Sequence, residues 1–174
     1  GNYPPGDNLT AETEQYDGTS WTEVSDLNTA RQNLEGNGSY TSALAFGGFV
    51  PPGNTTTAVT ESWNGSSWTE VSDLNQARIN MAALAAGGYI VGSPVTGATE
   101  LYNGTAWTET GDLNTARYHP SGGGTTASGL VFGGNPPATL GVTEDWNGGS
   151  WSEVADLNSG RNDMAGGGAD NTSA

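Results

Sequence analysis

The sequence contains no cysteine and no lysine, and each absence excludes a class of chemistry. Without cysteine the chain has no disulfide framework, no thiolate nucleophile and no thiolate metal ligand. All four basic residues are arginines, and they stand against 19 aspartates and glutamates, so the formal net charge is −15. Nucleic acids and the cytoplasmic membrane surface are anionic and repel such a chain. We therefore expect no nucleic-acid partner.

Long apolar runs are also missing. No stretch approaches the ~20 apolar residues of a membrane-spanning helix, so we expect no membrane insertion. The first five residues, Gly1 to Pro5, lack the basic and apolar parts of a signal peptide, and there is no initiator methionine. This start predicts a processed or excised piece of a larger product.

Turn-forming residues are abundant, with 28 glycines and 8 prolines. Such a composition is shared with disordered chains, but six tryptophans and six tyrosines recur at fixed spacing. Large aromatic side chains supply the apolar area that folding needs. We therefore expect a folded, turn-rich chain.

A pattern repeated four times dominates the sequence. Each copy carries Thr-Glu-x-aromatic, then Trp-Thr/Ser-Glu, then Asp-Leu-Asn, then arginine, and a glycine pair closes three of the copies. The recurring residues are Glu14, Glu61, Glu100 and Glu144; Trp21, Trp68, Trp107 and Trp151; Asp26, Asp73, Asp112 and Asp156; and Arg31, Arg78, Arg117 and Arg161. The pattern predicts a single segment over residues 1–174, with units of approximately 1–48, 49–88, 89–134 and 135–174.

Short strands are expected within each unit, because large apolar and polar residues alternate over 58–63 and 67–71. Asn64-Gly65 between them predicts a type I′ hairpin turn, in which both central residues have positive φ. Small apolar residues predict further strands over 42–46 and 128–132, and a weaker pattern predicts one over 32–36. No window shows helical periodicity, so the expected fold class is all-β.

The units are not identical in length. From the arginine to the glycine pair is 16 residues in the first and third units but only 9 in the second. The second unit is therefore either abbreviated or has a rebuilt hairpin. The terminal units are incomplete, since the chain starts late in one unit and ends early in another. This offset predicts part of a longer array, or several chains that complete one ring together.

The order of landmarks resembles that of Kelch repeats: a glycine pair, Glu-x-aromatic, a nearby tryptophan, then arginine before the next strand. The resemblance covers the whole chain and implies a β-propeller of four-stranded blades. It departs in one respect, because Tyr16 and Trp21 are closer together than in the usual Kelch loop. This Asn-Gly variant is similar to repeats in structural proteins of marine bacteriophages. That similarity implies a virion-surface or otherwise extracellular location.

Residues that recur in every unit are expected to be structural, since function rarely needs one group per repeat. The aspartates and arginines, for example Asp26 and Arg31, are expected to form ion pairs or carbonyl contacts that link neighbouring units. A ring of charge around a central channel is the alternative. The repeated glutamates could pair with the same arginines.

Catalysis and metal binding are not expected. Acid–base catalysis needs carboxylates in unequal environments, whereas repeated carboxylates imply equivalent ones. His119 is the only histidine, which leaves too few ligands for a zinc site or for the copper site of galactose oxidase, a Kelch protein. No 12-residue calcium loop is present. We therefore expect no catalytic residue, no cofactor and no metal, and a protein that is not an enzyme.

Residues outside the repeat are better candidates for recognition. Tyr40 lies in a loop that the second unit lacks, and Tyr118 and His119 follow the third arginine. With the proline loops at 51–52 and 136–137, they are expected to contact a ligand, or to be variable loops without one.

The function expected from these features is that of a virion-surface structural and adhesion protein, such as a phage tail fibre, that presents loops to a host receptor or glycan. Its partners would be other copies of itself, neighbouring virion proteins and the host surface. Two alternatives stay open: a purely architectural filament or decoration subunit, and an accessory domain of a secreted carbohydrate-active enzyme.

Overall fold

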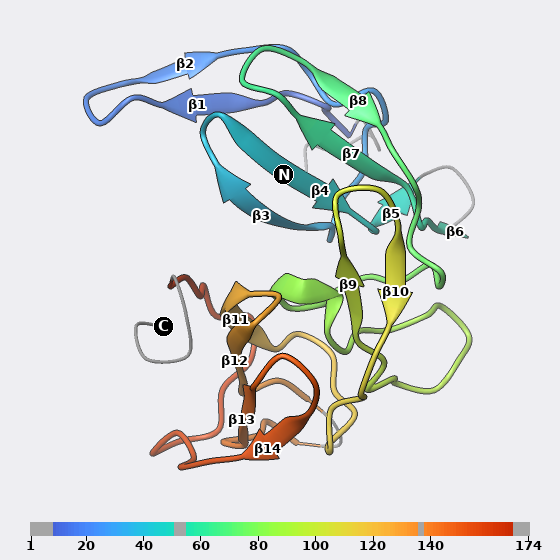
Figure 1. Ribbon diagram of the computed structural model, residues 1–174, viewed down its shortest axis with the longest axis vertical. Helices are drawn as coiled ribbons and strands as arrows, with labels where there is room; N and C mark the ends of the chain where they lie inside the picture. The colour runs from blue at the N-terminus through green and yellow to red at the C-terminus, as the bar shows by residue number, and fades with distance from the viewer. Residues whose placement is uncertain (1–8, 51–54, 136–137, 169–174) are drawn as a thin grey trace.

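The computed structural model describes residues 9–50, 55–135 and 138–168. Within these ranges the chain is all-β and contains no α-helix, as the sequence predicts (Figure 1). Two antiparallel sheets have four strands each, in the orders β3-β4-β7-β8 and β11-β12-β13-β14. The pairs β1-β2, β5-β6 and β9-β10 form two-stranded sheets.

The bounds of the first eight strands are β1 Glu14–Tyr16, β2 Trp21–Glu23, β3 Glu35–Ser39, β4 Ser42–Phe46, β5 Phe49–Val50, β6 Thr55–Thr56, β7 Thr60–Trp63 and β8 Trp68–Glu70. The remaining strands are β9 Glu100–Tyr102, β10 Trp107–Glu109, β11 Ser121–Thr125, β12 Ser128–Phe132, β13 Thr143–Trp146 and β14 Trp151–Glu153. Among the described residues one 3₁₀ turn, η1, spans Ala83–Ala85.

Four hairpins share one design, and we call them the Trp hairpins: β1–β2, β7–β8, β9–β10 and β13–β14. In each, the aromatic residue that ends the first strand pairs across the hairpin with the tryptophan that starts the second. The two rings lie 5.2 to 5.3 Å apart, a distance typical of favourable aromatic pairs. The five-residue spacing in the sequence therefore follows from a short loop that holds the two rings together.

The turn of these hairpins differs from the prediction. A two-residue type I′ turn at Asn64-Gly65 is wrong, because the four residues 64–67 lie between the paired strands and only the glycine has positive φ, at 94°. The Asn64 side-chain oxygen accepts the backbone N–H groups two and three residues further on, at 2.9 and 3.0 Å. The same contacts recur at Asp17, Asn103 and Asn147. The side chain thus closes the loop, which is a common use of Asn and Asp in turns.

A second type of hairpin, which we call the leading hairpin, precedes the Trp hairpin in each four-stranded sheet. It consists of β3–β4 in the first sheet and β11–β12 in the second. The predicted strands over 42–46 and 128–132 match β4 and β12, whereas the strand predicted over 32–36 begins only at Glu35. Gly47-Gly48 and Gly133-Gly134 each fall between a leading hairpin and its Trp hairpin, so each four-stranded sheet takes strands from two consecutive sequence units.

Within the described residues the second unit has no leading hairpin, so the unit is abbreviated, and a single tight turn is built in place of the hairpin. Ala82 and Ala86 pair through an isolated bridge across η1, and Ala86 pairs on its other side with Thr99. Leu84 and Ala85 both have positive φ, at 69° and 45°. One tight turn therefore replaces two strands and still connects the chain to β9.

The second residue after each arginine has the same left-handed backbone in all four units. The φ angles are 54°, 55°, 53° and 53° at Asn33, Asn80, His119 and Asp163, which are residue types that tolerate this conformation better than most. Their backbones also bond in series: Asn80 N donates to Asn33 O, His119 N to Asn80 O, and Asp163 N to His119 O, over 3.0 to 3.3 Å. We call this the cross-unit series, because it links all four units through equivalent atoms.

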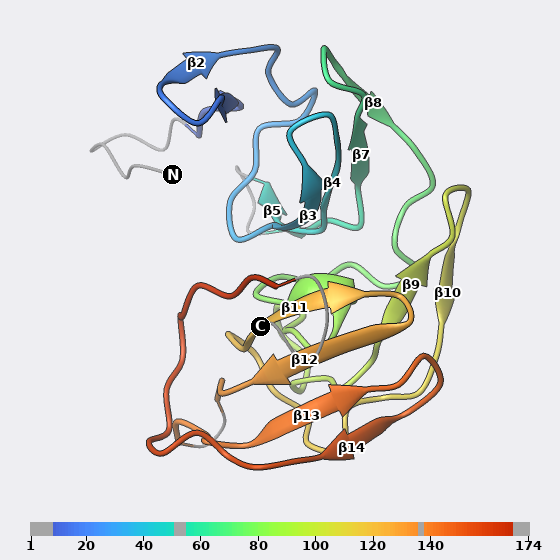
Figure 2. The ribbon, with the colours of Figure 1, turned by 60° about the vertical axis from the view of Figure 1, so that its left-hand side comes forward.

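The apolar core lies between consecutive sheets. One cluster places Trp107 of the third unit against Phe46 of the first, with ring centroids 5.0 Å apart, and includes Leu74, Met81 and Ala85. A second cluster consists of Ala82, Leu84, Ala86, Leu113, Val131, Trp146 and Trp151. Figures 1 and 2 show the sheets following one another along an arc, with β1–β2 near one end and β11–β14 at the other.

Candidate functional site

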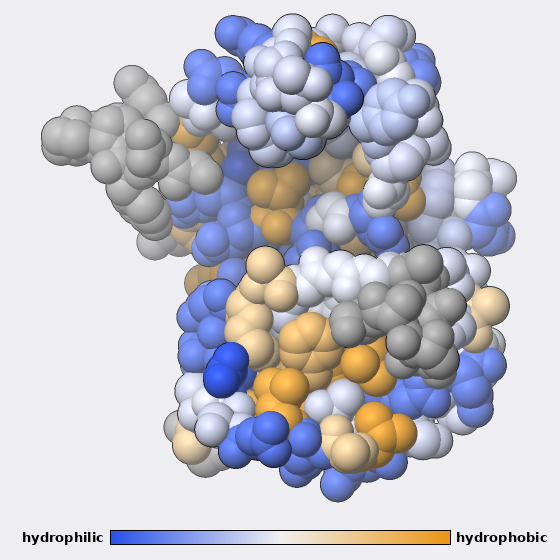
Figure 3. Space-filling view, turned by 90° about the vertical axis from the view of Figure 1, so that its left-hand side faces the viewer, coloured by the Kyte–Doolittle hydropathy of each residue, from blue (hydrophilic) through white to orange (hydrophobic). Residues whose placement is uncertain are grey.

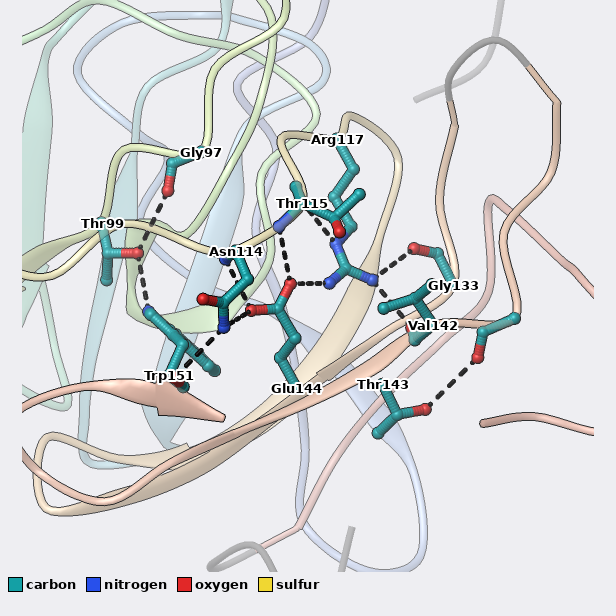
Figure 4. A network of polar contacts seen from close by, with 11 residues as sticks. Gly97, Thr99, Asn114, Thr115, Arg117, Gly133, Val142, Thr143, Glu144 and Trp151 are labelled. Atoms are coloured by element: carbon teal, nitrogen blue, oxygen red, sulfur yellow. Dashed lines mark hydrogen bonds and ion pairs between the residues drawn. The ribbon is translucent and has the colours of Figure 1, made fainter. Parts of the chain in front are cut away.

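The recurring charged residues form a buried cluster at each junction between units, shown for the third unit in Figure 4. Arg117 forms an ion pair with Glu144, and both side chains are fully buried. The same guanidinium donates to the carbonyl oxygens of Gly133 and Val142, at 3.2 and 2.7 Å. Asn114 donates its backbone and side-chain N–H groups to the glutamate at 2.7 and 2.8 Å. Every charge in this Arg–Glu cluster is therefore compensated.

The cluster is repeated at two other junctions. Arg78 pairs with Glu100 at 2.6 Å and donates to two carbonyl oxygens. Arg31 lies 3.3 Å from Glu61 without hydrogen-bond geometry and donates to one carbonyl, so the first cluster is looser. Burial lowers the pKa of Arg31 and Arg78 and the neighbouring glutamates oppose this shift. Guanidinium groups stay protonated in proteins, so the arginine of each cluster keeps its charge.

These contacts decide between the two interpretations of the repeated charges. The arginines bond to carbonyl oxygens and to the glutamate of the next sequence unit, as expected for a structural role. Arg31, Arg78 and Arg117 are at most 4% exposed, so for them a ring of charge around a channel is wrong. No Asp–Arg ion pair occurs within the described ranges, and instead Asp73 accepts a hydrogen bond from Thr60 N at 3.2 Å. Asp26, Asp112 and Asp156 are exposed and form no ion pair within the described ranges.

The repeated tryptophans also connect units. Three of the four donate their indole N–H to the threonine before the glutamate of the preceding unit: Trp68 to Thr13 at 3.2 Å, Trp107 to Thr60 at 3.0 Å, and Trp151 to Thr99 at 3.0 Å. Trp107 and Trp151 are 7% and 6% exposed, whereas Trp21 is 66% exposed. Trp21 therefore occupies the same position in the repeat but is not buried at a junction with another unit within the described residues.

Tyr40 lies at the tip of the leading hairpin β3–β4 and is 67% exposed. Its backbone oxygen accepts the indole N–H of Trp63 at 3.0 Å, which fixes the loop while leaving the ring free. The ring borders a groove of about 350 Å³ whose other aromatic lining residues are Tyr16, Trp21, Trp63 and Trp68. The groove lies beside the first Trp hairpin, next to which the described residues form no leading hairpin.

Tyr118 and His119 are brought together with two residues that the sequence did not single out. The Tyr118 ring lies 6.0 Å from Tyr89 and 5.0 Å from His119, and His119 Nδ1 pairs with an oxygen of Asp163. We call these four residues the Tyr–His cluster. The three ring-bearing side chains are all partly exposed. The repeat offers a signal for both added residues. Tyr89 directly follows a glycine pair, and Asp163 is the second residue after an arginine, as His119 is.

Tyr40 does not belong to the Tyr–His cluster. Tyr40 follows the strand β3, whereas Tyr118 and His119 precede the corresponding strand β11, so the two candidate loops lie at opposite ends of equivalent hairpins. The proline loops at 51–52 and 136–137 lie outside the described residues.

Two general features of the described ranges bear on function. They contain no group of three or more acidic or histidine side chains arranged to hold a metal ion. They also contain no helix that is long and apolar enough to cross a membrane.

Repeated antiparallel hairpins with cores between consecutive units define an all-β repeat protein. Neither the family models nor the curated protein sequences contain a match to this chain. Among solved structures, that of YjhT is similar, with a TM-score of 0.74 at 11% identity over 90% of this chain. The chain spans 65% of the length of YjhT, so the likeness concerns the fold of about two thirds of that protein.

Proposed function

We propose that this chain is a segment of a Kelch-type β-propeller in which each four-stranded sheet is a blade. The cross-unit series supports this arrangement, because equivalent residues of all four units bond in turn, as they do around a shared axis. The position of the apolar clusters between consecutive sheets is also typical of propellers.

The function that best fits this scaffold is non-enzymatic surface recognition, as in a phage tail fibre or another virion appendage. Three of the repeated arginines and three of the repeated glutamates are occupied inside the Arg–Glu clusters and are not available to a ligand. The observation that carries the proposal is the Tyr–His cluster, in which Tyr118 and His119 replace the Gln32 and Asn33 of the first unit. The scaffold tolerates other residues there, so these side chains serve a purpose of their own.

The Tyr–His cluster suits a sugar ring of a host glycan. Aromatic faces pack against the apolar face of a sugar, while His119 and Asp163 supply polar groups at its edge. The His119 side chain is 31% exposed and so remains within reach of a ligand. Weak single contacts are multiplied when many copies are displayed on one particle.

The test exchanges residues between units. The double substitution Tyr118→Gln and His119→Asn installs the first unit's residues in the third unit, so the fold should be retained. Binding of a multivalent display of the protein to a glycan array or to host cells should fall about tenfold or more. Tyr40→Ser, at the opposite end of an equivalent hairpin, is the control and should bind normally. Equal binding by both variants would refute a recognition role for the Tyr–His cluster.

A further inference from the structure

The Tyr–His cluster brings two tyrosine rings, a histidine ring and one carboxylate together on the surface. The rings of Tyr89 and Tyr118 are inclined to each other at 47°, and those of Tyr118 and His119 at 62°, so they do not stack flat. Asp163 lies beside them through its contact with His119 Nδ1. The face of a tyrosine ring attracts cations, and a carboxylate adds a full negative charge. The cluster therefore favours a positively charged ligand.

The side chains of the cluster are held by other contacts. The backbones of Tyr89 and Tyr118 are both paired to neighbouring segments, and the Tyr89 hydroxyl accepts the N–H of Gly92 at 3.4 Å. The Asp163 carboxylate accepts a hydrogen bond from Asn162 at 2.8 Å in addition to its contact with His119. Side chains that are fixed in advance lose less freedom when a ligand binds. Because the carboxylate oxygens are already engaged, the cluster suits a ligand that needs charge rather than hydrogen bonds.

Equivalent positions one unit earlier lack this combination. The backbone bridges and the left-handed residues identify the counterparts of Tyr89, Tyr118, His119 and Asp163 as Phe49, Ile79, Asn80 and His119. That set contains no tyrosine and no carboxylate. The repeat folds there without them, so the two tyrosines and the carboxylate are not needed to build the scaffold.

The charge of the whole protein also favours a cation. The formal net charge is −15, and three of the four arginines are buried in the Arg–Glu clusters. Exposed carboxylates recur in every unit, at Glu23, Asp26, Glu70, Asp73, Glu109, Asp112, Glu153 and Asp156. Hydrophilic residues are spread over both halves of the side of the molecule that Figure 3 shows. A field of one sign concentrates ligands of the opposite sign and repels anionic ones.

We propose that the Tyr–His cluster is a binding site for an organic ammonium group. A quaternary ammonium donates no hydrogen bond and is bound through ring faces and a nearby negative charge, which Tyr89, Tyr118 and Asp163 supply. His119 holds the Asp163 carboxylate beside the rings. On a host glycan such a group is an amino sugar or a choline substituent. This last step rests on the proposed function, whereas the ammonium site does not.

The first experiment compares choline with its neutral isostere, the alcohol in which carbon replaces the ammonium nitrogen, so that the two probes differ only in charge. Binding to the full chain is followed by NMR shifts of the tyrosine ring protons. The titrations are run at about pH 8, where imidazoles are largely neutral, because His119 carries a charge only when it is protonated. Choline should bind about fivefold more tightly, the factor expected for one cation–π contact at an exposed site. Equal binding of the two probes would overturn the proposal.

Residue exchanges between units supply variants that should keep the fold. Tyr118→Ile installs the residue of the second unit, and Asp163→Asn installs the residue of the first two units. Each should bring choline binding close to that of the isostere, whereas Tyr118→Trp, which keeps a ring face, should preserve the preference. Glu23→Gln is the control for net charge, since Glu23 is an exposed carboxylate on β2, near the other end of the arc. If Glu23→Gln weakened choline binding as much as Asp163→Asn, the attraction would belong to the whole protein and the site would be refuted.

The glycan array of the proposed function separates the two claims. Glycans with free amino sugars or with choline should bind better than the same glycans after N-acetylation or without choline, and Tyr118→Ile should abolish this preference. Equal binding of the charged and uncharged forms, lost when Tyr118 and His119 are exchanged, would leave the recognition function intact and overturn the ammonium site. Choline binding at the cluster without binding of any glycan would support the ammonium site and refute glycan recognition. A preference for one of the two substituents identifies the source of the ammonium group.

Discussion

Replacing Arg78 by methionine tests whether the Arg–Glu clusters hold consecutive units together. The substitution keeps most of the side-chain length but removes the charge that faces Glu100, at 2.6 Å. It also removes the donors to the carbonyl oxygens of Gly87 and Ala98, at 3.0 and 2.5 Å. The glutamate, only 2% exposed, then keeps Asn75 as its remaining hydrogen-bond donor.

The expected loss of stability follows from the burial of this pair. Removing one partner of a buried ion pair costs about 3–5 kcal/mol, because the other charge stays behind without compensation. The value for Arg78→Met should lie near the middle of that range, about 4 kcal/mol, since Asn75 still solvates the glutamate. In a chain of this size each kcal/mol lowers the melting temperature by roughly 2–4 °C, so a drop of roughly 8–16 °C is expected.

The assay is thermal unfolding followed by circular dichroism in dilute solution, with Arg161→Met as the matched substitution. Arg161 occupies the same position in the repeat but is exposed and has no ion-pair partner in the described ranges, so its replacement should cost at most about 0.5 kcal/mol. If the two variants lost similar stability, or if Arg78→Met were neutral, the buried pair would not be what stabilises the junction.

Three further predictions concern single residues. Gly87→Ala should lower the melting temperature more than Gly104→Ala, because both glycines have positive φ but only at Gly87 would a Cβ lie 2.6 Å from the Arg117 carbonyl oxygen; equal effects would contradict this. Burial raises the pKa of Glu35 above 4.5, so its charge destabilises the fold at neutral pH. Glu35→Gln should therefore raise the melting temperature at pH 7 and lose this advantage below about pH 4, where the wild-type carboxyl is protonated in both states; a gain independent of pH would exclude this cause. Asn64→Ala should destabilise by about 1 kcal/mol in urea unfolding, because two backbone N–H groups lose their acceptor, and an unchanged midpoint would show that water replaces the side chain.

The sequence predicts the strands well where the repeat and the alternation of residues agree. The strands over 42–46 and 128–132 and the aromatic pairs five residues apart are found as expected, because both features depend on local chemistry. The turn at Asn64 was mispredicted, since a dipeptide preference does not reveal that the side chain itself closes a longer loop. The rebuilt second unit follows from its length, but the 3₁₀ turn at Ala83–Ala85 depends on tertiary packing.

The candidate site was predicted only in part. Tyr118 and His119 stand out because they break the repeat, whereas Tyr89 and Asp163 come beside them through the fold. The sequence also hides that His119 belongs to the cross-unit series, since its backbone conformation is what the four residues share. A residue can therefore break a repeat in its side chain while its backbone continues it.

The cross-unit series has a consequence for how such a protein changes over generations. The contacts from one unit to the next use equivalent groups at each junction: a backbone carbonyl oxygen of the cross-unit series, an arginine and an asparagine. A whole unit can thus be duplicated or deleted in the gene without creating a junction whose two sides do not match. The number of units is free to vary by recombination. Selection can act on Tyr118 and His119 of one unit while the junctions between units stay interchangeable.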